Sequence, residues 1–233
     1  MLHGYGNVAE SFRTETKLDE AANERGYVVV YVNGMANDND KTSATGWNSG
    51  IGNSNRDDLG FLKTLASYMQ DKYKLTREQT FAAGFSNGGF MMYRIAVEGK
   101  DCFAGVSSVA GMMPEAMWDI KSEASDVSIL QINGTKDDVV PMNSNGSAKY
   151  SKAPAIEDVM DYFATANLLT DMKKEKLSEK SELIKRYSED AGTKSKQVWQ
   201  VLIENGRHSW PEEASCGFNV NALILDFFDE LAD

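Results

Sequence analysis

A glycine-flanked serine at residues 84 to 88 is the feature that most constrains the fold of this chain. The segment reads Gly84-Phe85-Ser86-Asn87-Gly88 and follows a short apolar run, Thr80 to Ala83. Between a strand and a helix, this pattern indicates a tight, strained turn whose flanking positions must be nearly free of side chain. The helix that follows points its N-terminal amides and positive dipole end at the serine. The pattern is typical of the turn on which serine hydrolases carry their nucleophile.

Strand-like and helix-like segments alternate along the rest of the chain. Val28 to Val32 is a near-continuous β-branched run, which predicts a strand buried on both faces. Apolar residues at helical spacing predict a helix over Leu59 to Met69. Further strands are expected just before Ser86 and at 104–109, 127–132 and 198–203, and further helices from the serine to about residue 98, at 156–167 and at 220–231. This alternation predicts an α/β fold with a mostly parallel sheet and helices on both faces.

The chain has 233 residues and no linker or internal repeat, which predicts one domain over residues 1–233. Leu168 to Lys196 is rich in lysine and glutamate and only weakly periodic, so we expect a solvated helix and loop there. The two cysteines, Cys102 and Cys216, do not make a disulfide framework, and we interpret them as free thiols.

The net charge of −11 argues against nucleic acid and against anionic membranes as partners. The longest apolar run is about six residues, too short to span a bilayer. The N-terminus begins Met1-Leu2-His3-Gly4, with neither the charged nor the apolar region of a signal peptide, so the compartment stays open. We expect a monomer or a weak homo-oligomer.

A serine hydroxyl at neutral pH is a poor nucleophile and needs a histidine base that a carboxylate orients. The chain has two histidines, and His3 precedes the serine. Since the order along the chain in such folds is serine, acid, histidine, His208 is the candidate base. It lies in a loop punctuated by Gly206 and Pro211, just after the last expected strand.

Two adjacent carboxylates, Asp137 and Asp138, follow the end of the expected strand at 127–132. One of them can accept from the imidazole Nδ1–H and hold its tautomer, while the other serves as a turn or cap residue. Their spacing alone does not choose between them.

Acyl transfer also needs two backbone N–H groups that stabilise the developing oxyanion. One is expected from Asn87, the residue after the serine, and the second from the loop that opens His3-Gly4, with Tyr5 as the donor. His3 then structures this loop and is not a base.

Several segments together resemble the polyhydroxybutyrate depolymerase-like esterases, a branch of the α/β-hydrolases that includes feruloyl and acetylxylan esterases. The matching segments are Leu2-His3-Gly4-Tyr5-Gly6-Asn7, residues 24–31, Gly46-Trp47-Asn48, residues 57–62, Gly84 to Gly89, Gly134-Thr135-Lys136-Asp137 with Val140-Pro141, and residues 206–211. They run from residue 2 to residue 211, which is nearly the whole chain.

This resemblance implies the α/β-hydrolase fold, with Ser86 as nucleophile, Asp137 as acid and His208 as base. It also implies oxyanion amides at Tyr5 and Asn87, and an aromatic lining from Trp47 and Trp210, for which core packing is the alternative. Asp57 and Asp58 are interpreted as caps of their helix.

The chain departs from the family in three places. Ser49 to Asn53 has none of the cysteines that many relatives carry after the Trp-Asn segment, and Met142 follows Val140-Pro141 where relatives usually have tyrosine. The family's central strand before Leu-His-Gly is absent, from which we expect a truncated N-terminal part of the sheet and low stability.

The expected activity is hydrolysis of a carboxylic ester without metal or organic cofactor. The resemblance favours a small-molecule or polysaccharide-linked ester, of the feruloyl or acetylxylan type, and a polyhydroxyalkanoate or a short-chain ester is the alternative. A peptidase of the same fold and a truncated, inactive binding module are the other readings.

Overall fold

A computed structural model of the chain describes residues 1–36, 43–51, 55–123, 127–143, 152–188 and 196–232. In chain order the elements are α1 (Ala9–Thr16), α2 (Leu18–Glu24), α3 (Asp58–Tyr73), η1 (Arg77–Gln79), β1 (Phe81–Phe85), α4 (Asn87–Glu98), β2 (Gly105–Val109), α5 (Glu115–Asp119), η2 (Lys121–Glu123), β3 (Ser128–Gly134), α6 (Ile156–Ala166), β4 (Asp171–Ser178), β5 (Ser181–Tyr187), β6 (Val198–Ile203), α7 (Glu213–Cys216) and α8 (Val220–Ala232).

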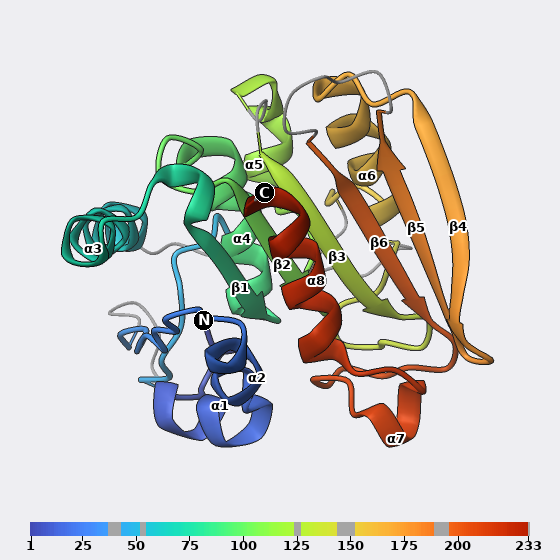
Figure 1. Ribbon diagram of the computed structural model, residues 1–233, viewed down its shortest axis with the longest axis horizontal. Coiled ribbons are helices and arrows are strands. Elements are labelled where there is room, and N and C mark those ends of the chain that lie inside the picture. Colours follow the sequence, from blue (N-terminus) through green and yellow to red (C-terminus); the bar gives the residue numbers. More distant parts are fainter. Residues whose placement is uncertain (37–42, 52–54, 124–126, 144–151, 189–195, 233) are drawn as a thin grey trace.

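The strands form one six-stranded sheet in the order β1-β2-β3-β6-β5-β4 (Figure 1). The pairs β1–β2, β2–β3 and β3–β6 are parallel, whereas β6–β5 and β5–β4 are antiparallel. A mixed sheet of this kind carries its antiparallel strands at one edge. The predicted mostly parallel α/β sheet is confirmed.

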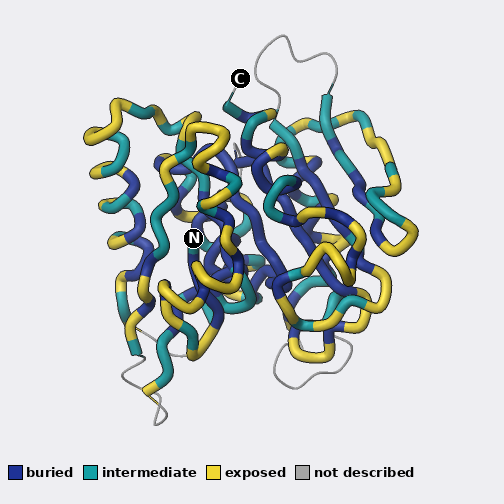
Figure 2. The backbone as a smooth tube through the Cα atoms, turned by 60° about the horizontal axis from the view of Figure 1, so that its bottom comes forward, coloured by how far each residue is buried: buried dark blue, intermediate teal, exposed yellow. Residues whose placement is uncertain are grey.

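Successive residues of the central strands point to opposite faces and so build two apolar cores. Ile129 packs in one core with the apolar faces of α3, α4 and α6, and the next residue, Leu130, packs in the other with α1, α2 and α8. In Figure 2 the strands run as a buried centre, and the exposed residues lie along the outer helices and loops. The predicted cover of helices on both faces is therefore present.

The segment 28–32 does not form the fully buried strand that its β-branched run predicts. Val32 alone makes a parallel bridge, to Leu2, and Val28 is 49% exposed. Leu2 also bridges Gly84 of β1, so it lies between the two segments as a strand one residue long. Apolar side chains of the 28–32 segment and of β1 line a cavity next to this bridge. A β-branched run needs a paired neighbour along its length, and Leu2 supplies one residue of pairing.

The segment 168–196 contains a β-hairpin in its described part, so the prediction of a solvated helix and loop was wrong. Strands β4 and β5 pair antiparallel from Asp171–Tyr187 to Ser178–Ser181. Leu183 and Ile184 of β5 are buried against the cores, while β4 forms the edge with its lysines exposed. Charged side chains protect an edge strand from pairing with other molecules, and they also conceal its β pattern in the sequence.

Both cysteines are free and buried, as interpreted from the sequence. Cys102 lies in the core beneath α3 and α4, and Cys216 lies in the core beneath α8. In the part of the chain that the structure describes, no helix combines the length and apolar character needed to cross a membrane.

Candidate active site

Ser86 lies at the turn between β1 and α4 with backbone angles of φ 52° and ψ −114°. A positive φ is rare and strained for a residue with a side chain, and such strain concentrates at functional sites. The glycines around it are required by close backbone approach. A β-carbon on Gly84 would lie 3.1 Å from the α-carbon of Gly88, and it would collide with the Gly88 carbonyl. The tight strand-to-helix turn expected from the glycine-flanked serine is therefore present.

His208 joins Ser86 to Asp137 across the loops at one end of the sheet. Its Nε2 lies 2.9 Å from the Ser86 Oγ, and its Nδ1 lies 2.7 Å from the Asp137 Oδ2. An ionised carboxylate only accepts hydrogen bonds, so the Nδ1 carries the proton and the Nε2 is left to accept from the serine hydroxyl. This is the arrangement that a general base requires.

The two adjacent aspartates differ in their surroundings, and Asp137 is the one that contacts the imidazole. Asp137 is buried and its Oδ1 accepts from the backbone N–H groups of Val139 and Val140, at 2.9 and 2.8 Å. Asp138 is exposed on the same turn. The side chain of Asp137 is 0% exposed and that of His208 is 15% exposed, so their contact is largely shielded from water. Hydrogen bonds to both oxygens hold the Asp137 carboxylate in its orientation toward the imidazole.

The loop from His3 to Gly6 lies directly over the serine. A β-carbon on Gly4 would lie 3.4 Å from the Ser86 Cβ, and Tyr5 beside it is 55% exposed. The His3 ring is fully buried. Its Nδ1 lies 2.7 Å from the Gly4 carbonyl oxygen, and its Nε2 accepts from the Gly34 N–H at 2.9 Å. Burial lowers the pKa of His3, while its bond to Gly4 acts in the opposite direction. His3 thus structures the loop in its neutral form, in agreement with the sequence interpretation.

Both candidate aromatic residues are buried. Trp47 is 4% exposed and lies against the His3 ring with a centroid separation of 5.3 Å. Trp210 is 6% exposed and meets Phe12 edge to face at 5.6 Å, in the core beneath α8. The structure gives both side chains packing partners, and their contact with substrate stays a prediction.

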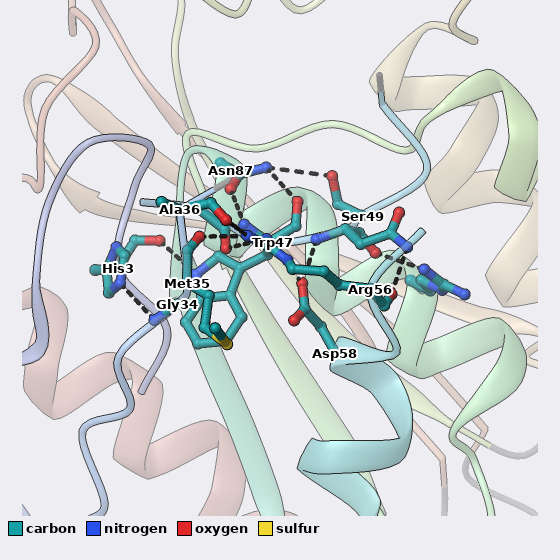
Figure 3. A network of polar contacts seen from close by, with 12 residues as sticks. His3, Gly34, Met35, Ala36, Trp47, Ser49, Arg56, Asp58 and Asn87 are labelled. Atoms are coloured by element: carbon teal, nitrogen blue, oxygen red, sulfur yellow. Dashed lines mark hydrogen bonds and ion pairs between the residues drawn. The ribbon is translucent and has the colours of Figure 1, made fainter. Parts of the chain in front are cut away.

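A polar network that the sequence did not reveal surrounds Trp47 (Figure 3). The Asn87 side chain pairs with the Trp47 backbone, and Arg56 and Asp58 hold the loop on the other side. Asp57 accepts from the Gly60 N–H as the expected N-cap of α3. Asp58 instead accepts from the Asn48 N–H, 2.6 Å away, and from Arg56. The bonds of Trp47 to Asn87 and to His3 span 40 and 44 residues of sequence, so no local pattern indicates them.

Within the described residues, no group of three or more His, Cys, Asp or Glu side chains is arranged to hold a metal ion. The structure brings together three of the predicted site residues, Ser86, His208 and Asp137. Two more lie beside the serine: Tyr5 in the His3 loop and Asn87 at the start of α4.

Solved structures show the same fold at low sequence identity. The F65L variant of SOBER1 from Arabidopsis thaliana superposes with a TM-score of 0.61 at 12% identity, covering 100% of this chain and 98% of that one. An acetyl xylan esterase from Aspergillus awamori gives 0.61 at 12% identity, covering 98% and 87%. A Bacillus cereus carboxylesterase gives 0.56 at 15% identity, covering 99% and 86%.

Sequence comparison identifies the family. The "Putative esterase NocK" of Nocardia uniformis subsp. tsuyamanensis is 30% identical over 156 residues, which are 67% of this chain and 44% of that protein. The chain thus spans less than half the length of this relative. A family model described as "Putative esterase" matches residues 1–210. Because that match takes in 210 of the 233 residues, the chain belongs to this esterase family.

Proposed function

We propose that this chain hydrolyses carboxylic esters through a catalytic triad of Ser86, His208 and Asp137. The observation that carries the proposal is the position of the His208 ring, whose two nitrogens lie 2.9 Å from the Ser86 Oγ and 2.7 Å from the Asp137 Oδ2. Membership of an esterase family supports the same reaction.

The first half of the reaction forms an acyl-enzyme. The Ser86 Oγ attacks the ester carbonyl carbon while His208 Nε2 takes the hydroxyl proton. The negative charge then develops on the carbonyl oxygen, where the backbone N–H groups of Tyr5 and Asn87 are proposed to donate. Removing one such donor typically costs about 3 kcal/mol in the transition state. The bond to the alcohol oxygen breaks, and His208 returns the proton to that oxygen.

The second half releases the acid. Water attacks the acyl carbon as His208 takes one of its protons, and a second tetrahedral oxyanion forms on the same carbonyl oxygen. The bond to the Ser86 Oγ then breaks, and the serine recovers its proton from His208. Asp137 keeps its charge throughout and stabilises the imidazolium that forms in each half.

For the substrate we propose a small acyl ester on plant cell-wall polysaccharide, of the acetylxylan or feruloyl type. The family resemblance of the His3, Ser86 and His208 segments supports this class. The likeness to an acetyl xylan esterase of Aspergillus awamori is one of fold. The net charge of −11 gives an anionic substrate no long-range attraction, which favours a neutral ester.

The test compares p-nitrophenyl acetate with methyl ferulate, using Ser86→Ala as the control. Turnover of both, abolished in the variant, would support a phenolic and acetyl esterase. Turnover of acetate alone would favour deacetylation or a short-chain polyester. Failure of a cooperatively folded protein to turn over either ester, or to be labelled at Ser86 by a fluorophosphonate, would contradict the proposal, since only an assembled site activates this serine.

A further inference from the structure

Trp47 contacts both backbone segments that carry the proposed oxyanion donors. Its indole N–H donates to the carbonyl oxygen of His3 at 2.9 Å, in a buried bond. Its backbone N–H donates to the Oδ1 of Asn87 at 2.6 Å. Figure 3 shows Trp47 near the centre of the network, with His3 on its left and Asn87 above it.

The contact with Asn87 is reciprocal. The Asn87 Nδ2 donates back to the Trp47 carbonyl at 3.2 Å and lies 3.3 Å from the Ser49 Oγ. The side-chain amide therefore binds both the N–H and the C=O of Trp47, much as a neighbouring strand would. Because Asn87 is the first residue of α4, this pairing fixes the start of the helix relative to the tryptophan.

The loop that holds Trp47 is itself anchored from the opposite side. Arg56 donates to the carbonyl of Gly46 at 2.7 Å and to that of Ala36 at 2.6 Å, and it also binds the carbonyl of Met35. Asp58, at the start of α3, accepts from the Asn48 N–H at 2.6 Å and from Arg56 at 3.1 Å. Trp47 is thus held between anchored residues on both sides in sequence.

His3 is held on its other side as well. The Nε2 of its ring accepts from Gly34, which immediately precedes the Met35 and Ala36 carbonyls bound by Arg56. A β-carbon on Gly34 would lie 3.0 Å from the carbonyl carbon of Gly46, so these two loops are also in direct backbone contact. The His3 segment is therefore fixed to the Trp47 segment through two independent routes.

We propose that Trp47 is a positioning residue of the ester-hydrolysing site, which sets the distance between the Tyr5 and Asn87 amides. This inference rests on the proposed function. It assigns the buried tryptophan to the oxyanion site and not to the sugar-binding surface. A displacement of about 1 Å in such donors can lower the rate about 100-fold, so hydrogen bonds that fix both segments affect kcat more than binding.

The test is Trp47→Phe, which keeps a ring in the core and removes the indole N–H. The matched control is Trp199→Phe, because Trp199 is equally buried and its indole N–H also donates one hydrogen bond, to Gln197, in the opposite core. We expect Trp47→Phe to lower kcat on p-nitrophenyl acetate about 10- to 100-fold with KM within about twofold. Trp199→Phe should leave both constants within about twofold.

Inhibition by a trifluoromethyl ketone distinguishes a positioning role of Trp47 from a purely structural one. The ketone forms a hemiketal with Ser86 whose oxyanion occupies the proposed site, so its inhibition constant should rise in proportion to the loss of kcat/KM. The inhibition constant of the corresponding trifluoromethyl alcohol, which cannot form a hemiketal and so presents no oxyanion, should stay unchanged. Equal effects of the two phenylalanine variants, or an unchanged ketone affinity in Trp47→Phe, would overturn the proposal.

Asn87→Ala removes the hydrogen bonds between the Asn87 side chain and the Trp47 backbone but keeps the Asn87 backbone N–H. It therefore tests the same inference if Trp47→Phe fails to fold. Once the bond of Trp47 to His3 or the bonds of Asn87 to Trp47 are lost, losing the other should lower activity little further. We therefore expect the double variant to lose less activity than the product of the two single losses. Fully multiplicative losses would contradict the inference.

If the wild type turns over no ester, the proposed function fails and this inference fails with it. If only Ser86→Ala is inactive, the esterase stands and the Trp47 role does not.

Discussion

A β-carbon placed on Gly88 would lie 2.8 Å from the carbonyl oxygen of His3 and 2.7 Å from the carbonyl carbon of Leu2. Real β-carbons do not make contacts this short. Helix α4 can therefore pack against the His3 loop only because residue 88 has no side chain. The same His3 carbonyl accepts the Trp47 indole N–H. Both the packing of α4 and the Trp47 bond therefore act on one carbonyl beside the nucleophile.

Gly88→Ala should consequently displace the His3 loop and reduce activity beyond what its loss of stability explains. Forcing a methyl group into a filled site costs about 1–3 kcal/mol. We expect kcat to fall at least about 10-fold, measured on p-nitrophenyl acetate at a temperature where the variant is folded by circular dichroism.

Gly26→Ala is the matched control for this glycine substitution. A β-carbon on Gly26 would meet nothing within 4 Å, and the cost arises from its φ of +80° alone. That strain is about 1–2 kcal/mol, so the control loses a similar amount of stability without touching the loop. Equal losses of activity in the two variants would show that Gly88 acts through stability only.

Asp137→Asn should lower kcat about 10³- to 10⁴-fold with little change in fold. The amide keeps the size of the carboxylate, but it can donate to the imidazole and favours the wrong tautomer. Asp138→Asn is the control, because its side chain is exposed one residue away, and it should stay within about twofold. Steady-state kinetics on one ester compares the two, and an active Asp137→Asn would exclude the proposed triad.

The parts of the site that the sequence predicted are those that local backbone chemistry encodes. The glycines beside Ser86 are needed by the turn itself, and His208 follows the last strand of the parallel part of the sheet. The central strands and the helices α3, α4, α6 and α8 follow from hydrophobic periodicity, because each has a core-facing side.

What the sequence did not reveal depends on partners distant in the chain. The two β4 and β5 strands carry so many lysines and glutamates that their one buried face is hidden in the pattern. The run at 28–32 has strand propensity but one bridged residue, since pairing depends on a neighbour and not on the run itself. For Trp47 the sequence left substrate contact and core packing open, because the carbonyl that fixes the direction of its indole N–H lies 44 residues away.

The two cysteines should be unreactive in the folded protein. Burial raises the pKa of the Cys102 thiol and of the Cys216 thiol, so little thiolate is present near neutral pH. We expect no reaction with 5,5′-dithiobis(2-nitrobenzoate) on the timescale of the assay, and two equivalents after unfolding in guanidinium chloride. Rapid labelling of the native protein with loss of activity would contradict this placement of the thiols.

The stability of the fold should decrease as the pH falls below about 6.5, the ordinary pKa of histidine, because of His3. Burial lowers the pKa of His3 in the folded protein, so the unfolded chain takes up this proton first. The contribution of neutral His3 to the free energy of unfolding is therefore fully present above the pKa of the unfolded chain. It is lost as the pH falls from there toward the lowered pKa of the folded protein. Protonation also turns the Nε2 from an acceptor into a donor. Two donors, the Nε2–H and the Gly34 N–H, then face each other, and this hydrogen bond is lost.

The measurement is the free energy of unfolding from urea titrations between pH 5 and 7, for the wild type and for His3→Gln. Glutamine has no titrating group, so we expect the variant to be less stable at pH 7 and to show a shallower decline toward pH 5. The Met1 amine, whose pKa burial lowers to about 5, is common to both proteins and cancels in the difference. Parallel curves for the two proteins would mean that His3 takes up its proton equally in both states, and that its hydrogen bonds do not depend on the neutral form.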